Sequence, residues 1–351
     1  MKSQNFFMTK LHRISQPCLF LILLGTACLL FTGCKRNTEP ISRTGFYFDT
    51  VIQVTLYDTE DTTVLDGCFE LAQAYEQLFS ATVEGSDVWN INHSGGKSVI
   101  VSEETASILS TAIDYAVMTD GAFDPTIRPV SELWPFGSED EPRVPAEADI
   151  QKALSHVSYK NIRINYDDTT EMAQSGVCSV SLGDADAAID LGAVAKGYIA
   201  DQMKEYLLSR NVHSACISLG GNVLVIGKKP DHSPFRIGIQ KPFAPEGTSL
   251  GTVEIRDTSM VTSGIYERCF YEKDVFYHHI LDTATGYPVD NELAAVTILC
   301  PSSTKADILS TACMCLGLSE GRHFLEGFPD TEYMLITKDG TRYCSDGFTI
   351  Q

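Results

Sequence analysis

Residues 190–201 read DLGAVAKGYIAD, and this segment decides most about the fold and the chemistry of the chain. It follows the apolar run 187–189, and its spacing predicts a turn that opens a helix continuing to Leu208. Small residues at such a turn let the backbone approach a ligand closely, and the unpaired N–H groups of a first helical turn suit a phosphate. Lys196 would add a cation and Asp190 a hydrogen-bond acceptor. Two interpretations stand at this point: a nucleotide or pyrophosphate site, or a turn whose small residues permit tight packing.

The glycine spacing of this segment matches neither GxGxxG nor GxxxxGK[ST], so neither a common dinucleotide-binding motif nor a P-loop is predicted. Elsewhere strand and helix patterns do not alternate strictly. We therefore expect an α+β fold with mixed, largely antiparallel sheets and packed helices. Expected strands are 46–56, 177–182, 213–218, 235–239, 251–255, 275–281, 294–300 and a closing hairpin of 333–337 and 341–344. Expected helices are 63–79, 105–119, 306–316 and 318–328.

The N-terminus has the pattern of an export signal. Basic residues precede an apolar run at 18–31 with no acidic residue, which is typical of a signal peptide. The run ends in FTGC, which resembles a bacterial lipobox with Cys34 as the lipidated residue; an uncleaved membrane anchor is the alternative. We expect a lipoprotein signal peptide at 1–33, the lipidated cysteine and a polar tether at 34–44, and one domain at 45–351. The acyl chains would hold the mature chain on the extracytoplasmic face of the cell membrane.

The charge balance excludes one class of partner. Loss of residues 1–33 removes three positive charges and no negative ones, so the net charge goes from −20 to −23. Proteins that bind nucleic acid need basic patches to replace counterions, so nucleic acid is not an expected partner. A phosphate ligand would have to be bound locally by a few cations, backbone N–H groups or a divalent metal ion.

Three further segments carry candidate chemistry. Residues 121–129 read GAFDPTIRP, where Asp124 before a proline is held in a fixed direction, either for a ligand or within a rigid turn. Residues 218–222 read SLGGN, whose paired glycines permit a bulge or a close ligand approach. Residues 277–289 contain two adjacent histidines, His278 and His279. In a strand their side chains point to opposite faces, so at most one of them belongs to a given site. A histidine beside Asp282 is either a general base or an ordinary hydrogen-bonded residue.

A possible metal site lies further along the chain. Asp307 and Thr311 are four residues apart on a predicted helix and hence share a face. A carboxylate and a hydroxyl offer hard oxygen ligands that suit Mg²⁺ with a phosphate substrate. The same pair also occurs on ordinary helix surfaces and at helix caps.

Taken in order, these segments resemble the ApbE family, the FAD:protein FMN transferases of bacterial cell envelopes. The resemblance runs from about Phe46 to Thr337, and its most specific parts are GAFDPTI, DLGAVAKGYIAD, SLGGN, and HHILDTATGYP paired with ADILSTA. It implies an ApbE-like fold and Mg²⁺-dependent transfer of FMN from FAD to a threonine or serine hydroxyl of an acceptor protein. The product is a phosphoester, and AMP is released.

The resemblance also implies roles for matching residues. His279 would activate the acceptor hydroxyl, and Mg²⁺ would be held by the backbone carbonyl of Ala193 and by Asp307 and Thr311. Phe48 stands where the family commonly has a methionine near the flavin. The other implied FAD-binding residues are Ala122, Phe123, Asp124, Asp190, Lys196 and Ile280.

Two other functions remain open from the sequence. One is a Mg²⁺-dependent FAD pyrophosphatase, in which water replaces the acceptor hydroxyl and the products are FMN and AMP. The other is a non-catalytic flavin-binding lipoprotein. The joint presence of His279, Asp307 and Thr311 argues against pure binding, because a binder needs no base beside the pyrophosphate.

Overall fold

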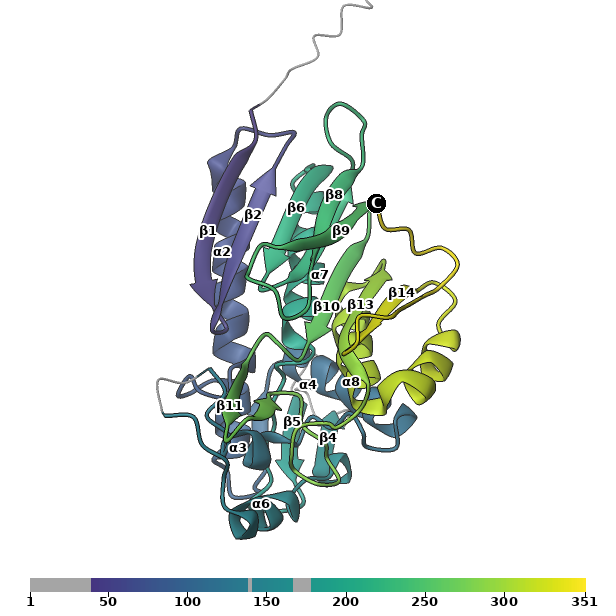
Figure 1. Ribbon diagram of the computed structural model, residues 1–351. Coiled ribbons are helices and arrows are strands. Elements are labelled where there is room, and N and C mark those ends of the chain that lie inside the picture. The colour runs from purple at the N-terminus through teal and green to yellow at the C-terminus, as the bar shows by residue number, and fades with distance from the viewer. Residues whose placement is uncertain (1–38, 138–140, 167–177) are drawn as a thin grey trace, which may run out of the picture. The chain divides into compact units, whose positions relative to one another are not determined.

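The main sheet of the computed structural model is antiparallel throughout (Figure 1). The structure describes residues 39–137, 141–166 and 178–351, so the expected signal peptide and Cys34 lie outside the described residues. In sheet order, its eight described strands are β1 (Ile41–Tyr47), β2 (Thr50–Leu56), β6 (Ser214–Leu219), β7 (Asn222–Gly227), β10 (Ser259–Gly264), β13 (Leu293–Cys300), β14 (Glu332–Thr337) and β15 (Arg342–Cys344).

The first two strands correct the sequence prediction. The expected single strand 46–56 is a hairpin, because Phe48 and Asp49 both adopt φ of 53° and reverse the chain. This is the left-handed region that two-residue hairpin turns require. Strand β1 begins at Ile41, so residues 41–44, expected to belong to the tether, are part of the sheet.

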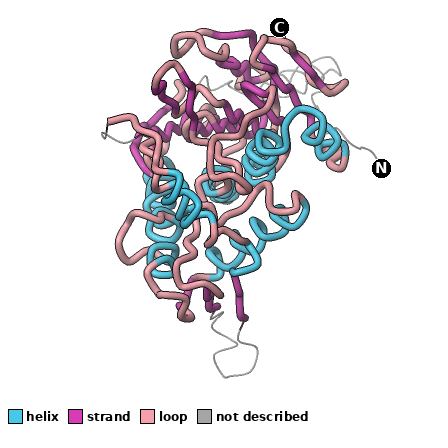
Figure 2. The backbone as a smooth tube through the Cα atoms, turned by 60° about the horizontal axis from the view of Figure 1, so that its bottom comes forward, coloured by secondary structure: helices cyan, strands magenta, loops and turns pink. Residues whose placement is uncertain are grey.

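Three long helices cover one face of the sheet, as Figure 2 shows from below. They are α2 (Thr62–Phe79), α7 (Ala195–Ser209) and α8 (Ser303–Glu326). Helix α8 is interrupted at Gly317, whose φ of 79° is not helical. The expected break between helices 306–316 and 318–328 is therefore confirmed.

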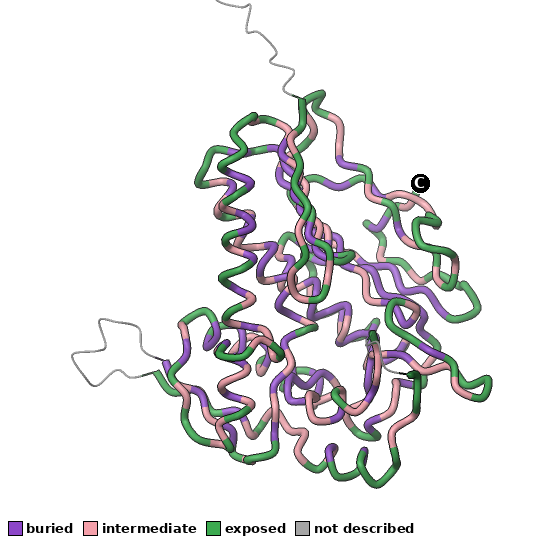
Figure 3. The backbone as a smooth tube through the Cα atoms, turned by 90° about the vertical axis from the view of Figure 1, so that its left-hand side faces the viewer, coloured by how far each residue is buried: buried purple, intermediate pink, exposed green. Residues whose placement is uncertain are grey.

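The opposite face of the sheet is covered by the hairpin of β8 (Phe235–Gln240) and β9 (Ser249–Ile255). Alternate residues of β7 accordingly enter different cores: Leu224 and Ile226 face the helices, whereas Val225 packs beneath the hairpin. Because β7 is buried on both faces, it lacks the polar alternation that marks a half-buried strand. Figure 3 shows buried segments, in purple, in both the helices and the strands of the sheet.

A smaller region completes the domain and carries several motifs. It contains a three-stranded antiparallel sheet of β3 (Val99–Val101), β5 (Cys178–Leu182) and β4 (Ile162–Tyr166), and a separate hairpin of β11 (Cys269–Glu272) and β12 (Val275–His278). The expected strand 275–281 thus ends three residues early. The remaining helical segments are α3 (Asp87–Asn92), α4 (Glu103–Met118), α5 (Arg128–Ser131), α6 (Glu147–Leu154) and the 3₁₀ turn η1 (Tyr159–Asn161). In the described residues, no helix is both long and apolar enough to cross a membrane.

Candidate active site

The loop 121–129 is held rigid by the carboxylate of Asp124, which is only 8% exposed. One oxygen accepts hydrogen bonds from the backbone N–H and hydroxyl of Thr126, at 2.8 and 2.6 Å. The other accepts from the N–H of Tyr159 at 2.7 Å. Burial raises the pKa of this carboxyl, and these three bonds act in the opposite direction. The side chain of Asp124 therefore fixes the loop, which is one of the two roles that the sequence left open.

This loop lies directly against the segment that begins at Asp190. The N–H of Asp190 donates to the carbonyl of Pro125 at 2.8 Å, and Ile127 forms a parallel bridge with Ala188. Arg128, which the sequence analysis did not single out, adds a guanidinium 3.6 Å from the Asp190 carboxylate. Two motifs more than sixty residues apart are thus joined into one surface.

Within the turn, polar groups of residues 190–196 bond one another. The Asp190 carboxylate accepts from the N–H of Gly192 at 2.7 Å, and the ammonium of Lys196 donates to the Gly192 carbonyl at 2.6 Å. The same ammonium lies 3.5 Å from the carboxylate of Asp307. Lys196 consequently stands between the turn and helix α8, with its side chain 26% exposed.

Helices α7 and α8 meet at Gly197 and Asp307. The N–H of Gly197 donates to the Asp307 carboxylate at 2.9 Å, in a buried contact. A Cβ on Gly197 would lie 2.4 Å from the backbone carbonyl oxygen of Ser303, so only glycine permits this approach. Gly197 therefore both permits the tight packing of the two helices and positions Asp307, a candidate metal ligand.

Contacts between the two helices repeat at a spacing of four residues. Asp201 accepts from the N–H of Ser303, and Gly197 donates to Asp307. Thr311 lies one turn beyond Asp307 on α8, whereas Ala193 precedes α7, which begins at Ala195. Joint binding of Mg²⁺ by Ala193, Asp307 and Thr311 stays a prediction.

The donor set fits a hard cation. Asp307 offers a carboxylate that is 3% exposed, Thr311 a hydroxyl and Ala193 a carbonyl, all of them oxygens. The Thr311 hydroxyl lies 3.3 Å from that of Ser263, which also bonds Ser310 at 2.7 Å. The sequence analysis gave Ser263 no role, because a serine within a strand carries no local signal of such a contact.

His279 follows strand β12 and is half-buried. The backbone N–H of His279 donates to the backbone carbonyl of Arg268 at 3.1 Å, and the ring Nδ1 lies 3.3 Å from the same oxygen. Burial lowers the pKa of His279 to about 4, and the positive charges of Arg268 and Lys196 act in the same direction. The imidazole is therefore neutral at neutral pH, the form that can accept a proton.

The neighbouring residues have structural roles. His278 is 3% exposed, and burial lowers its pKa to about 4. Asp282 accepts hydrogen bonds from Ala284 N–H and the Thr285 hydroxyl, and the hydroxyl of Thr283 donates to the Gly121 carbonyl at 2.8 Å. This turn joins the histidine segment to the loop 121–129.

The other expected FAD-binding residues are partly or fully buried. Phe123 and Ile280 are each 5% exposed and belong to the apolar cores, and Ala122 is half-buried. Phe48 is half-buried at the β1–β2 turn, where its N–H donates to Glu76 at 2.7 Å. Their contact with a nucleotide stays a prediction.

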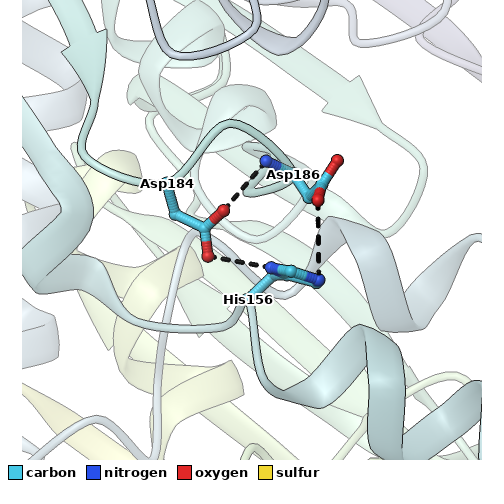
Figure 4. Close-up of side chains that lie close together, drawn as sticks. All are labelled: His156, Asp184 and Asp186. Atoms are coloured by element: carbon cyan, nitrogen blue, oxygen red, sulfur yellow. Dashed lines mark hydrogen bonds and ion pairs between the residues drawn. The ribbon is translucent and has the colours of Figure 1, made fainter.

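A second polar cluster lies on the turn that precedes residues 187–189. His156 stands between Asp184 and Asp186, as Figure 4 shows. Its Nδ1 lies 2.8 Å from Asp184, whereas Nε2 lies 3.9 Å from Asp186. Each of the three side chains also offers one ligand atom within 4.8 Å of the others, so the arrangement is compatible with a hydrogen-bonded bridge and with a metal ion. The hydrogen bond from His156 lowers the pKa of Asp184.

Together, these features define an α+β protein with an oxygen-rich, cation-compatible site where a glycine turn meets two helices. The chain belongs to the ApbE family, whose model matches residues 48–335. It is similar to the FAD:protein FMN transferase of Klebsiella pneumoniae (strain 342), with 36% identity over 82% of this chain and 86% of the relative. It is also similar to the FAD:protein FMN transferase of Treponema pallidum (strain Nichols), with 30% identity over 88% and 87%.

Solved structures agree with this membership. The ApbE protein of Thermotoga maritima superposes with a TM-score of 0.77 and 32% identity, over 88% of this chain and 97% of that one. The flavin transferase ApbE of Vibrio cholerae gives a TM-score of 0.75 and 26% identity, with the same coverage. The expected family and α+β fold class are confirmed.

Proposed function

We propose that the protein is an FAD:protein FMN transferase that moves FMN from FAD to a hydroxyl of an acceptor protein and releases AMP. Relatives with 36% and 30% identity carry this activity in their names, and the similarity covers more than four fifths of each chain. The structural observation that carries the proposal is the meeting of Lys196 and Gly197 with Asp307. At this place the ammonium of Lys196 and the N–H of Gly197, both close to the glycine turn, contact the buried carboxylate of Asp307.

In the proposed reaction, the acceptor hydroxyl oxygen forms a bond to the flavin-side phosphorus. The bond from that phosphorus to the bridging oxygen breaks, and AMP leaves with the electron pair. We assign the hydroxyl proton to His279. With Nδ1 turned to the Arg268 carbonyl, Nε2 carries the lone pair that accepts this proton, and the low pKa of His279 keeps it available.

Lys196 would stabilise negative charge on the pyrophosphate. Its ammonium is partly exposed and is held by the Gly192 carbonyl. A cation that is already held in place needs little rearrangement as charge develops, which is the main source of electrostatic catalysis.

Mg²⁺ would be held by Asp307, Thr311 and the carbonyl of Ala193, and when bound it supplies a Lewis acid for the phosphate oxygens. The Gly197 N–H and the Lys196 ammonium orient the Asp307 carboxylate. Ser263 does the same for the Thr311 hydroxyl.

The acceptor and the location are parts of the same proposal. We infer that the accepting group is a threonine or serine hydroxyl, since an alcohol gives a stable phosphoester once His279 removes its proton. We also infer that the chain acts outside the cytoplasm, anchored by lipid on Cys34. The support is the apolar run at 18–31 and the FTGC sequence that ends it.

The experiment is to incubate the protein with FAD, Mg²⁺ and a candidate acceptor domain, and to measure acceptor mass and AMP together. The proposal predicts an acceptor that gains FMN while AMP appears. Free FMN with an unchanged acceptor would instead indicate the pyrophosphatase, and tight FAD binding without any product would indicate a binding protein. Either result overturns the proposed transfer.

A further inference from the structure

Asp201 is the last residue of the DLGAVAKGYIAD segment, and the proposed reaction gives its carboxylate no role. Asp201 lies in α7, yet its two oxygens accept hydrogen bonds across the helix pair, from residues at the beginning of α8. They accept from the hydroxyl of Ser302 at 3.0 Å, the N–H of Ser303 at 2.8 Å, and both the N–H and hydroxyl of Thr304 at 2.9 and 2.7 Å. A helix N-terminus leaves such N–H groups without partners inside the helix, and a carboxylate there also meets the positive end of the helix dipole.

The same helix end is bound from a second side. The hydroxyl of Ser303 donates to the side-chain carbonyl of Asn222 at 2.7 Å, and Ser259 contacts Ser303 at 2.9 Å. Asn222 is the last residue of the SLGGN segment and opens strand β7. Helix α8 is therefore attached at its first turn to both α7 and the main sheet.

Ser303 and Asp307 are one helical turn apart, so an axial shift of α8 moves both together. The Asp201 contacts hold the first turn where Ser303 touches Gly197, and the next turn then presents Asp307 to the Gly197 N–H and to Lys196. Asp201, Gly197 and Lys196 all belong to α7. One rigid helix thus carries both the groups that contact Asp307 and the carboxylate that sets the position of α8.

We propose that Asp201 is a positioning residue for the metal ligand Asp307: it fixes the register of α8 on α7, and so sets metal affinity without touching the metal. This inference rests on the proposed function only in taking Asp307 as a ligand. Loss of an outer-shell partner that bonds a ligand directly weakens metal binding by about 10- to 100-fold in other proteins, and Asp201 acts one contact further from the metal, through the helix pair.

The chain offers a matched control. The carboxylate of Asp87 in α3 caps the start of α4 in the same way, accepting from the N–H and hydroxyl of Ser102 and the hydroxyl of Thr105, each at 2.8–2.9 Å. Helix α4 carries none of the proposed ligands. All three bonds end on one oxygen, Oδ2, which the oxygen of an asparagine amide would replace. Asp87→Ala is therefore the variant that removes a cross-helix cap at a place where metal affinity has no reason to change.

The test compares Asp201→Asn, Asp87→Ala and the unaltered protein. Mn²⁺ is titrated into each in the presence of FAD and without acceptor, with free Mn²⁺ followed by electron paramagnetic resonance, and thermal unfolding is recorded in parallel. We expect both variants to unfold at lower temperature, but only Asp201→Asn to lose about 10-fold or more in Mn²⁺ affinity. Equal Mn²⁺ affinity in Asp201→Asn and the unaltered protein, or an equal loss in both variants, overturns the inference.

A milder variant covers the case in which Asp201→Asn does not fold. Thr304→Val keeps the shape of the side chain and removes one of the four bonds to Asp201, so it should show a smaller loss of Mn²⁺ affinity in the same titration. Unchanged affinity in that variant would then count against the inference. Failure of the unaltered protein to bind Mn²⁺ with FAD would refute the metal site itself, which is a different outcome from failure of the Asp201 role.

Discussion

Replacement of Gly197 by alanine tests the contact between α7 and α8 at its narrowest point. The added Cβ would lie 2.4 Å from the carbonyl oxygen of Ser303 and 2.7 Å from both its carbonyl carbon and the Cα of Thr304. These are backbone atoms, so no side-chain rotation relieves the overlap. Restoring an ordinary contact, which begins at 3.4 Å, needs the helices to separate by about 1 Å.

A separation of that size has two consequences. Overpacking of a close contact costs about 1–3 kcal/mol, and the higher helix propensity of alanine offsets about 1 kcal/mol of it. The hydrogen bond from Gly197 to Asp307, now 2.9 Å, would lengthen beyond the usual limit of about 3.2 Å. We therefore expect a modest loss of stability but a large loss of metal affinity, about 10-fold or more.

The assay is the Mg²⁺ concentration that gives half-maximal FMN transfer, measured beside the thermal midpoint. Gly67→Ala in α2 is the control, because the three atoms nearest to its Cβ would all belong to the ring end of Tyr206, a side chain that can turn away. We predict a raised Mg²⁺ requirement in Gly197→Ala alone. A normal Mg²⁺ requirement in that variant would falsify the argument that close helix packing positions Asp307.

Three further predictions follow from the site. His279→Gln should reduce transfer by about 10²- to 10⁴-fold while leaving FAD fluorescence quenching unchanged; transfer at the normal rate would exclude it as the base. In the free protein, the C2 protons of His279 and His278 should titrate near pH 4 in NMR spectra. Both pKa values lie below the unfolded value of 6.5, so this contribution to stability should be complete above pH 6.5 and should decline as the pH falls towards 4. A titration midpoint near pH 6.5 for either histidine would contradict the burial argument. Asp124→Asn should lower the free energy of unfolding by about 1–3 kcal/mol and weaken FAD binding, because both carboxylate oxygens accept bonds and the amide NH₂ group cannot. Asp231→Asn makes the same change at a surface turn that uses one oxygen, and it should do neither; equal effects of the two would mean that loop 121–129 has no special role.

Local patterns of the sequence predicted much of the fold. Helix α2 carries its apolar residues at helical spacing, and the glycine at 317 separates two helical segments as expected. The β1–β2 hairpin was not predictable in the same way, because Phe48 and Asp49 adopt a left-handed turn without the glycine or asparagine that signals one. Strand β7 was missed because it is buried on both faces.

For the site, the sequence supplied the residues but not their contacts. Residues 190–201 offered two interpretations, a phosphate site or tight packing, and Gly197 shows tight packing that also orients Asp307. Asp124 is held by bonds to Thr126 and Tyr159 that the sequence did not reveal, and its expected contact with the nucleotide stays a prediction. Such contacts depend on pairing between elements more than a hundred residues apart, as in α7 and α8, which no local periodicity encodes.

We propose that Lys196, Gly197 and Asp307 form part of a metal-dependent phosphate site at which FMN is transferred. The most direct measurement is FMN added to an acceptor domain, with AMP counted in the same samples, over a Mg²⁺ titration of the unaltered protein, Asp307→Ala and Asp330→Ala. Asp330 is a surface residue that pairs with Lys305 at the start of α8 and serves as the control. We predict equimolar FMN and AMP in the unaltered protein and in Asp330→Ala, and neither product in Asp307→Ala or after chelation of Mg²⁺. Full transfer by Asp307→Ala, or transfer that persists with the metal removed, would contradict the account.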